Sequence, residues 1–203
     1  KADGGLVVMN AKAADSLTSA VVNNKGVIEA QTLENKSGKI MLMSDMENGT
    51  TVVDGTLDAS APNGGDGGFI ETSGNNVQVQ RGAVVTAFAP EGTTGTWSID
   101  PTDFTIVAGK AAQTASGIGA KTLQKNLKLA NTTIETYTTA ADGNTEDGNI
   151  NVNAALTWSQ NTLALEALGD VNINAVMTVS DTAALDMKAG FNGSTYDGIG
   201  TVR

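Results

Sequence analysis

The sequence predicts an all-β chain that folds as a parallel β-helix, a solenoid in which short strands wind through successive stacked coils. Two observations predict this fold. Strand-like segments that begin with glycine recur at nearly constant spacing through the first half of the chain. A shorter and more exact repeat fills the second half. One coil cannot bury its own apolar face, so regular repeats of this length indicate coils that stack to form a shared core.

The first repeated segment has a glycine followed by larger side chains two and four residues later. This period of two is typical of a strand with one buried face. Successive starts are separated by 33, 30 and 27 residues, and they occur at Gly5, Gly38, Gly68 and Gly95.

A second segment lies between these starts and has the pattern glycine, any residue, aliphatic, any residue, small. It begins at Gly26, Gly55 and Gly82, with spacings of 29 and 27 residues. The pattern aligns Ile28 with Leu57 and with Val84. Each repeat of residues 1–108 therefore carries at least two strands, and we expect turns at 31–38, 44–50, 60–67 and 89–95, where Asn, Gly, Ser and Asp are abundant.

The period changes in the connecting segment 109–131. Leu123 and Leu127 are four residues apart, with lysines around them, which predicts a short amphipathic helix near 119–128. Ser116 is a possible start signal for this helix. The lysines, Lys121, Lys125 and Lys128, could form a basic contact patch, but a solvated helix face explains them as well.

Residues 132–203 contain the clearest repeat, after a threonine-rich strand in 131–142 and a polar turn at 142–148. The segment Gly148–Ala154 matches Gly169–Ala175 at a distance of 21 residues, and two following segments repeat at 21 and 22. We therefore expect Ile150 to stack near Val171 and Val152 near Ile173. Asn151 and Asn153 recur as Asn172 and Asn174, so amide ladders between layers are possible.

Three stretches together resemble the exoproteins of two-partner secretion, the family of filamentous haemagglutinins and high-molecular-weight adhesins. They are GGFIETSG at 67–74, V-x-V-x-x-G at 77–82 and GTWSIDPTDFTI at 95–106. The resemblance implies a right-handed parallel β-helix that a dedicated outer-membrane transporter exports to the surface of a Gram-negative bacterium. It also implies an adhesive role, with a receptor or glycan on host or neighbouring cells as partner, and we expect a secreted protein.

The amino-acid composition argues against several classes of partner and functional site. The 12 basic and 22 acidic residues leave a formal charge of −10, which argues against nucleic acid and anionic membranes as partners. The sequence has no cysteine and no histidine, which excludes disulfides, thiolate nucleophiles and Cys/His metal sites. No apolar run reaches the roughly 20 residues that span a bilayer, and we expect no membrane insertion. Both ends fall within repeats, so we expect a segment of a longer solenoid.

Two segments resemble calcium loops but lack ligands. Gly64–Phe69 has phenylalanine where the calcium-binding nonapeptide needs aspartate. Asp142–Gly148 begins like an EF-hand loop, but its glycine is one place late and Asn153 replaces the glutamate. We expect no metal and no cofactor. Four glycosylation sequons, at Asn35, Asn48, Asn131 and Asn192, are about as many as this composition yields by chance.

An enzyme is the main alternative, because many β-helix proteins cleave polysaccharides. Glu29 and Asp58 occur at equivalent repeat positions and could stack as a carboxylate pair, which glycoside hydrolysis requires. A lyase would need a basic residue, and Lys25, Lys39 and Arg81 are the candidates near the pair. A solvated strand face explains these residues more simply, so we expect no enzymatic activity. A second alternative is the stalk of a contact-dependent toxin.

Overall fold

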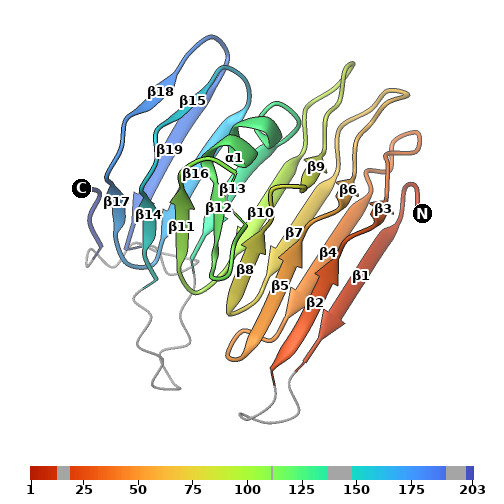
Figure 1. The fold of residues 1–203 in the computed structure, drawn as a ribbon. Helices are drawn as coiled ribbons and strands as arrows, with labels where there is room; N and C mark the ends of the chain where they lie inside the picture. Colours follow the sequence, from red (N-terminus) through yellow and green to blue (C-terminus); the bar gives the residue numbers. More distant parts are fainter. Residues whose placement is uncertain (13–18, 111, 137–147, 191–199) are drawn as a thin grey trace.

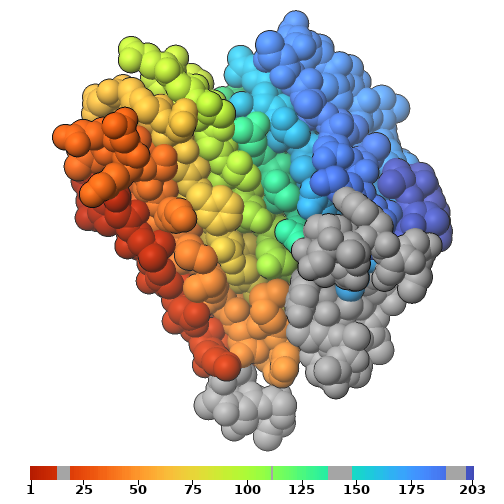
Figure 2. Space-filling view, turned by 180° about the vertical axis from the view of Figure 1, so that it is seen from behind, coloured from red at the N-terminus to blue at the C-terminus, as the bar shows by residue number. Residues whose placement is uncertain are grey.

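The computed structural model describes residues 1–12, 19–110, 112–136, 148–190 and 200–203. Within these ranges the chain is mostly β-structure, with parallel sheets and one helix, as the sequence predicted. Strands follow one another side by side from the N-terminal to the C-terminal end (Figure 1). Seen from behind, the sequence colours form successive bands across the molecule (Figure 2).

Sheet 1 contains every third strand of the chain, from β1 at the N-terminal end to β19 at the C-terminal end. Leu6 lies opposite Lys39, Lys39 opposite Phe69, and Phe69 opposite Thr96. These pairs confirm the spacings of 33, 30 and 27 residues that the glycine starts predicted. All neighbours are parallel, and their order is β1 (Leu6–Ala11), β4 (Lys39–Ser44), β7 (Phe69–Ser73), β10 (Thr96–Asp100), β13 (Asn131–Glu135), β16 (Thr162–Ala167) and β19 (Ala184–Ala189).

Sheet 2 contains the strand that follows each strand of sheet 1, with one insertion. In the sequence β11 precedes β12, but in the sheet β12 lies between β8 and β11. The segment 109–131 therefore contributes a strand as well as a helix. The parallel order is β2 (Ala20–Asn24), β5 (Gly49–Val53), β8 (Asn76–Val79), β12 (Gly117–Gly119), β11 (Phe104–Val107), β14 (Ile150–Val152) and β17 (Val171–Ile173).

The third group of strands is divided in two, with the helix between. Sheet 3 contains β3 (Val27–Glu29), β6 (Thr56–Asp58) and β9 (Val84–Thr86), and sheet 4 pairs β15 (Leu156–Trp158) with β18 (Met177–Val179). Helix α1 (Ala120–Asn126) lies between β9 and β15 (Figure 1). Two of its amide side chains bond to these strands: Asn126 Oδ1 accepts the Val85 N–H at 2.8 Å, and Gln124 Nε2 donates to the Thr157 carbonyl at 3.0 Å.

The helix has the amphipathic character expected for 119–128. Leu123 and Leu127 are fully buried, whereas Lys121, Lys125 and Lys128 are exposed. Ser116, however, does not start the helix, because the N-cap is Gly119 and no side chain caps it. Ser116 Oγ instead accepts the Val77 N–H at 2.9 Å. No helix in the described ranges is long and apolar enough to cross a membrane.

The core consists of aliphatic side chains that alternate inward along each strand. In β10, Trp97 and Ile99 are fully buried between half-buried neighbours. Ile70 lies beside Trp97 on one side and beside Ile40 on the other, and all three are inaccessible to solvent. Because burial is shared between adjacent strands, each layer stabilises the next.

The 21-residue repeat is confirmed in register. Ile150 lies opposite Val171 and Val152 opposite Ile173. The predicted amide ladders are also present: Asn172 Nδ2 donates to Asn151 Oδ1 at 3.0 Å, and Asn174 Nδ2 donates to Asn153 Oδ1 at 2.7 Å.

One predicted alignment is wrong by a single residue. Leu57 lies opposite Val85, not Val84, and Val85 is the fully buried residue. The Ala83 N–H donates to the Gln80 carbonyl in a turn that takes up the extra residue, so Ala83 occupies the position predicted for Gly82. A shift of one residue exchanges the two faces of a strand. In β9 the buried residue is therefore Val85, whereas the sequence pattern predicted Val84.

The observed turns lie where the sequence predicted them, but the turn predicted at 44–50 is shorter, because β4 extends to Ser44 and β5 begins at Gly49. In the threonine-rich stretch 131–142, β13 ends at Glu135, and residues 137–142 lie outside the described ranges.

Candidate functional site

The carboxylate pair considered for catalysis is adjacent, and each carboxylate has a polar partner among the described residues. Glu29 lies opposite Asp58 on neighbouring strands of sheet 3. The Asp58 carboxylate accepts hydrogen bonds from Gln31 Nε2 at 2.7 Å and from the Ser60 N–H at 2.9 Å, and Glu29 lies 3.8 Å from Lys1 Nζ. The Gln31 contact joins residues 27 positions apart, whereas the Ser60 contact is local.

The three basic residues considered with that pair lie elsewhere. Lys25 and Arg81 line a shallow hollow of about 470 Å³ over sheet 2, together with Asp54. Lys39 begins β4 in sheet 1. The structure therefore does not bring a basic residue of this set to Glu29 and Asp58.

The glycine-rich turn at 64–69 has a structural role. Gly64 and Gly65 have φ angles of +100° and +86°, in the left-handed region that favours glycine. Asp66 Oδ1 accepts the Thr93 N–H at 2.7 Å, which joins this turn to the turn at 89–95. The similar segment Asp142–Gly148 lies outside the described residues, apart from Gly148.

Among the residues that the structure describes, no group of three or more Asp, Glu, His or Cys side chains is placed to hold a metal ion. We therefore expect chelators to leave the melting temperature unchanged within error, because a bound ion would add stability that chelation removes. Thermal unfolding with EDTA and with added calcium measures this. A fall of several degrees on calcium removal would show that one of the two turns binds the ion.

Asn131, one of the sequon asparagines, serves a structural purpose. Its Nδ2 donates to the Thr94 carbonyl at 2.8 Å, and its Oδ1 accepts the Thr162 N–H at 2.9 Å. Asn192 lies outside the described residues.

The most unusual chemistry in the described part of the chain is an acidic cluster that sequence reasoning missed. Four carboxylates lie on successive strands of sheet 1, and we call them the carboxylate cluster: Glu71, Asp100, Glu135 and Glu166. Glu135 lies opposite Glu166, and the pair Ile99–Ile134 places Asp100 next to Glu135. Glu71 lies opposite Ser98 and is diagonal to Asp100. Adjacent strands are about 4.8 Å apart, so these like charges are close.

The cluster borders a hollow of about 450 Å³ on the outer face of sheet 1. Glu71, Ser73 and Asp100 line one part of it, and Asn10 and Met43 line another. Asp100 Oδ1 is inaccessible to solvent and accepts no hydrogen bond from any described residue. Burial, followed by the negative charges of Glu135 and Glu71, raises the pKa of Asp100 to about 7.

The other members of the cluster differ in their charge environment. Burial and the charge of Glu166 raise the pKa of Glu135 as well, although Lys188 opposes this. Glu166 is neutralised directly, because Lys188 Nζ lies 2.6 Å from its Oε1 and 3.3 Å from the Asp186 carboxylate. Lys188 lies opposite Glu166 and is three strands away from Asp100. Near neutral pH, Asp100 can hold a proton and can therefore donate a hydrogen bond.

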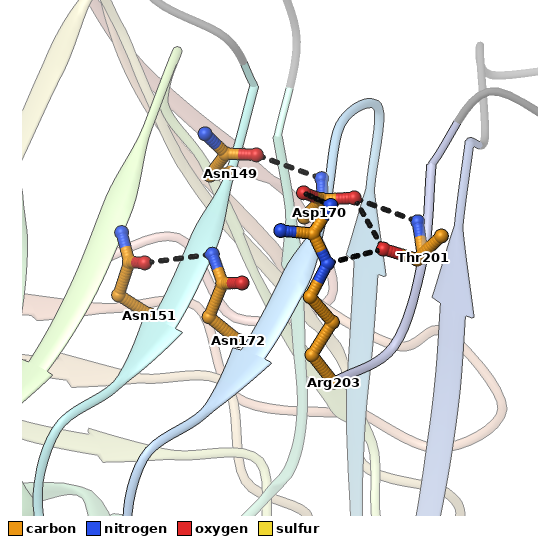
Figure 3. Close-up of polar contacts among 6 residues, drawn as sticks. All are labelled: Asn149, Asn151, Asp170, Asn172, Thr201 and Arg203. Carbon is orange, nitrogen blue, oxygen red and sulfur yellow. Dashed lines mark hydrogen bonds and ion pairs between the residues drawn. The ribbon is translucent and has the colours of Figure 1, made fainter.

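A second polar array runs across sheet 2 at the C-terminal end (Figure 3). Asn149 Oδ1 accepts the Asp170 N–H at 2.7 Å, and Asp170 Oδ1 accepts the Thr201 N–H at 2.7 Å and the Thr201 hydroxyl at 2.8 Å. Arg203 Nη2 lies 2.8 Å from Asp170 Oδ2. The Thr201 hydrogen bonds lower the pKa of Asp170. Because each oxygen bonds to the next strand, this array holds strands in register.

Comparison of the chain with protein-family models, with curated proteins and with solved structures finds no match.

Proposed function

We propose that the chain is a right-handed parallel β-helix and that it forms a structural, adhesive segment of a large secreted exoprotein of the two-partner secretion type. The observation that carries the fold proposal is the cyclic strand order. Through the first nine strands the chain passes through sheets 1, 2 and 3 in turn and returns each time to sheet 1 one strand further along, and β13 to β19 repeat this path with sheet 4 in place of sheet 3. A chain that repeats this path with parallel pairing winds as a helix, and crossovers between parallel strands are right-handed in nearly all proteins.

The stretches that carry the family resemblance lie together. Trp97, from GTWSIDPTDFTI, is fully buried, and its Nε1 donates to Thr72 Oγ1 at 3.1 Å. Thr72 belongs to GGFIETSG, which forms β7. Glu71 and Asp100 of the same stretches border the hollow on the outer face of sheet 1. The contacts of Trp97 and Thr72 lie in the interior, where they serve the fold. They support a relationship in architecture and leave ligand contact to surface residues.

Surface loops are the natural place for such contact, because the core side chains are committed to stacking. The turns 60–67 and 89–95 lie against each other: the Gly67 N–H donates to the Thr93 carbonyl at 2.9 Å. Asn63 and Glu91 are exposed on these turns. A receptor or glycan on host or neighbouring cells would meet this loop surface or the outer face of a sheet. The outer-membrane transporter would act during export.

The adhesion proposal is tested with the purified chain and cultured cells. Replacing Asn63 and Glu91 together with alanine should weaken attachment by about tenfold or more, the loss expected when about 1.4 kcal/mol of contact energy is removed. The melting temperature should stay constant, because exposed substitutions change stability by roughly 0.5 kcal/mol at most. Lys25→Ala, exposed over sheet 2, is the matched control and should bind normally. Equal binding by the double variant would remove this loop surface from the proposal; no attachment by the unchanged chain to any cell type would contradict adhesion.

The enzymatic alternative is tested by incubating the chain with a panel of polysaccharides. Under the adhesin proposal no reducing ends or unsaturated products form. Turnover that is lost in Asp58→Asn would favour the pair Glu29 and Asp58, and turnover lost in Asp100→Asn would favour the carboxylate cluster.

Export is tested in cells with and without the transporter encoded beside the parent gene. Loss of surface exposure without it would support two-partner secretion, and a toxin domain after this segment would favour the stalk alternative.

A further inference from the structure

We propose that the carboxylate cluster (Glu71, Asp100, Glu135 and Glu166) is a pH-sensitive device: sheet 1 is held more tightly when a proton is bound at Asp100 than when all four carboxyls are ionised. The proposal goes beyond the adhesive function and does not depend on it. It rests on the placement of four carboxyls on four successive strands, β7, β10, β13 and β16.

The geometry makes Asp100 the proton-holding member. Its Oδ1 is enclosed and accepts no hydrogen bond from the described residues, so ionisation leaves a charge without compensation at that oxygen. Glu71 and Glu135 face it from the strands on either side, β7 and β13. The neutral residues Ser73 and Met43 complete the hollow beside it.

Among the described residues of sheet 1, the lysines do not lie on the strands next to Asp100: Lys39, on β4, is two strands away, and Lys188, on β19, is three. Lys188, on β19, forms ion pairs with Glu166 and Asp186. Lys188 is therefore paired with Glu166 on β16, whereas Asp100 and Glu71 lie two and three strands from β16. Ser73 Oγ donates to Glu71 Oε1 at 3.1 Å, a contact that positions the Glu71 carboxyl on the face that it shares with Asp100.

The sign of the pH effect follows from the raised pKa of Asp100. The folded chain binds this proton more tightly than the unfolded chain, so the destabilising effect of ionised Asp100 is complete above pH 7. It declines as the pH falls through 7 and is gone below 3.8, the ordinary pKa of an aspartate side chain. The Asp100 carboxyl has a pKa of about 7 in the folded chain. Lowering the pH from 8 to 5 therefore increases the ratio of folded to unfolded molecules by about 90-fold through this one group.

The decisive experiment compares pH profiles of stability. Urea unfolding of the unchanged chain is measured at several pH values from 5 to 8 at constant ionic strength, beside Asp100→Asn and the control Glu91→Gln, which removes an exposed loop carboxyl. Stability of the unchanged chain and of Glu91→Gln should rise as the pH falls. Asp100→Asn should lose most of that rise, because asparagine has no proton to bind. An Asp100→Asn profile as steep as that of the unchanged chain would overturn the proposal.

A direct titration keeps the test independent of the folding of any variant. The Asp100 carboxyl, labelled with carbon-13 in the unchanged chain, should titrate with a midpoint near 7. Glu135→Gln removes one neighbouring negative charge and should lower that midpoint, whereas Glu91→Gln should leave it in place. A midpoint near 4 in the unchanged chain would contradict the proposal, whatever the variants do.

Discussion

Ile70→Ala should lower the free energy of unfolding by about 2–5 kcal/mol, the usual cost of truncating a buried aliphatic side chain to alanine. Ile70 is fully buried and lies in register between Ile40 and Trp97, which are also fully buried. Removing its side chain leaves a cavity against both neighbours, and the flanking strands hold those neighbours in place. Val171, which is buried opposite Ile150, should respond in the same direction.

Urea unfolding measures this prediction as a lower midpoint with an unchanged m-value. Ile70→Val is the matched control and should cost only about 0.5–1.5 kcal/mol, because most of the side chain remains. Substitutions of the exposed residues Asn63 and Glu91 should change stability by roughly 0.5 kcal/mol at most. Asn144, a loop residue for which the sequence predicts the same neutrality, lies outside the described ranges. A loss below about 1 kcal/mol in Ile70→Ala would mean that this position is not part of a tightly packed core.

Asn126→Leu should be the most damaging polar substitution in the helix. Asn126 is fully buried; its Oδ1 accepts the Val85 N–H at 2.8 Å, and its Nδ2 donates to the Thr122 carbonyl at 3.0 Å. Leucine has a similar volume but cannot bond to β9, so the buried Val85 N–H loses its partner. A buried backbone group without a partner costs about 1–3 kcal/mol.

Two measurements separate this effect from a general loss of helix. Unfolding of Asn126→Leu should show the lower stability, and the Val85 amide should exchange its hydrogen faster than in the unchanged chain. Gln124→Leu is the control, because Gln124 also bonds to a neighbouring strand but in an exposed position, and it should cost about 1 kcal/mol or less. Unchanged stability and unchanged exchange at Val85 would show that the helix does not support β9.

The parts of the fold that repeat locally could be predicted from the sequence. The starts at Gly5, Gly38, Gly68 and Gly95, and the 21-residue match between Ile150 and Val171, each became a strand pair. This works because a stacked parallel strand places the same kind of side chain at the same position of every repeat. The amphipathic helix was predictable for a similar reason, since Leu123 and Leu127 show its period directly.

The errors arose where one residue or one segment departs from the repeat. The turn at Ala83 adds a residue and exchanges Val84 with Val85, and Ser116 bonds to Val77 instead of capping the helix. The insertion of β12 between β8 and β11 reverses the chain order locally, which no spacing in the sequence indicates. The contact of Ser116 with Val77 and the pairing of β12 with β8 each join residues 39 positions apart.

By itself, the sequence determined a mostly β chain with parallel stacking and one short helix, because periodic apolar residues dictate which side chains are buried. Only the tertiary structure assembled the carboxylate cluster. The 35 positions between Asp100 and Glu135 match neither the 27–33-residue pattern of the first half nor the 21–22-residue pattern of the second. The 31 positions between Glu135 and Glu166 do not match the pattern of the second half, where both residues lie. Their proximity follows from β10, β13 and β16 being neighbours in sheet 1, and the raised pKa of Asp100 follows from burial and charge, which are properties of the folded chain alone.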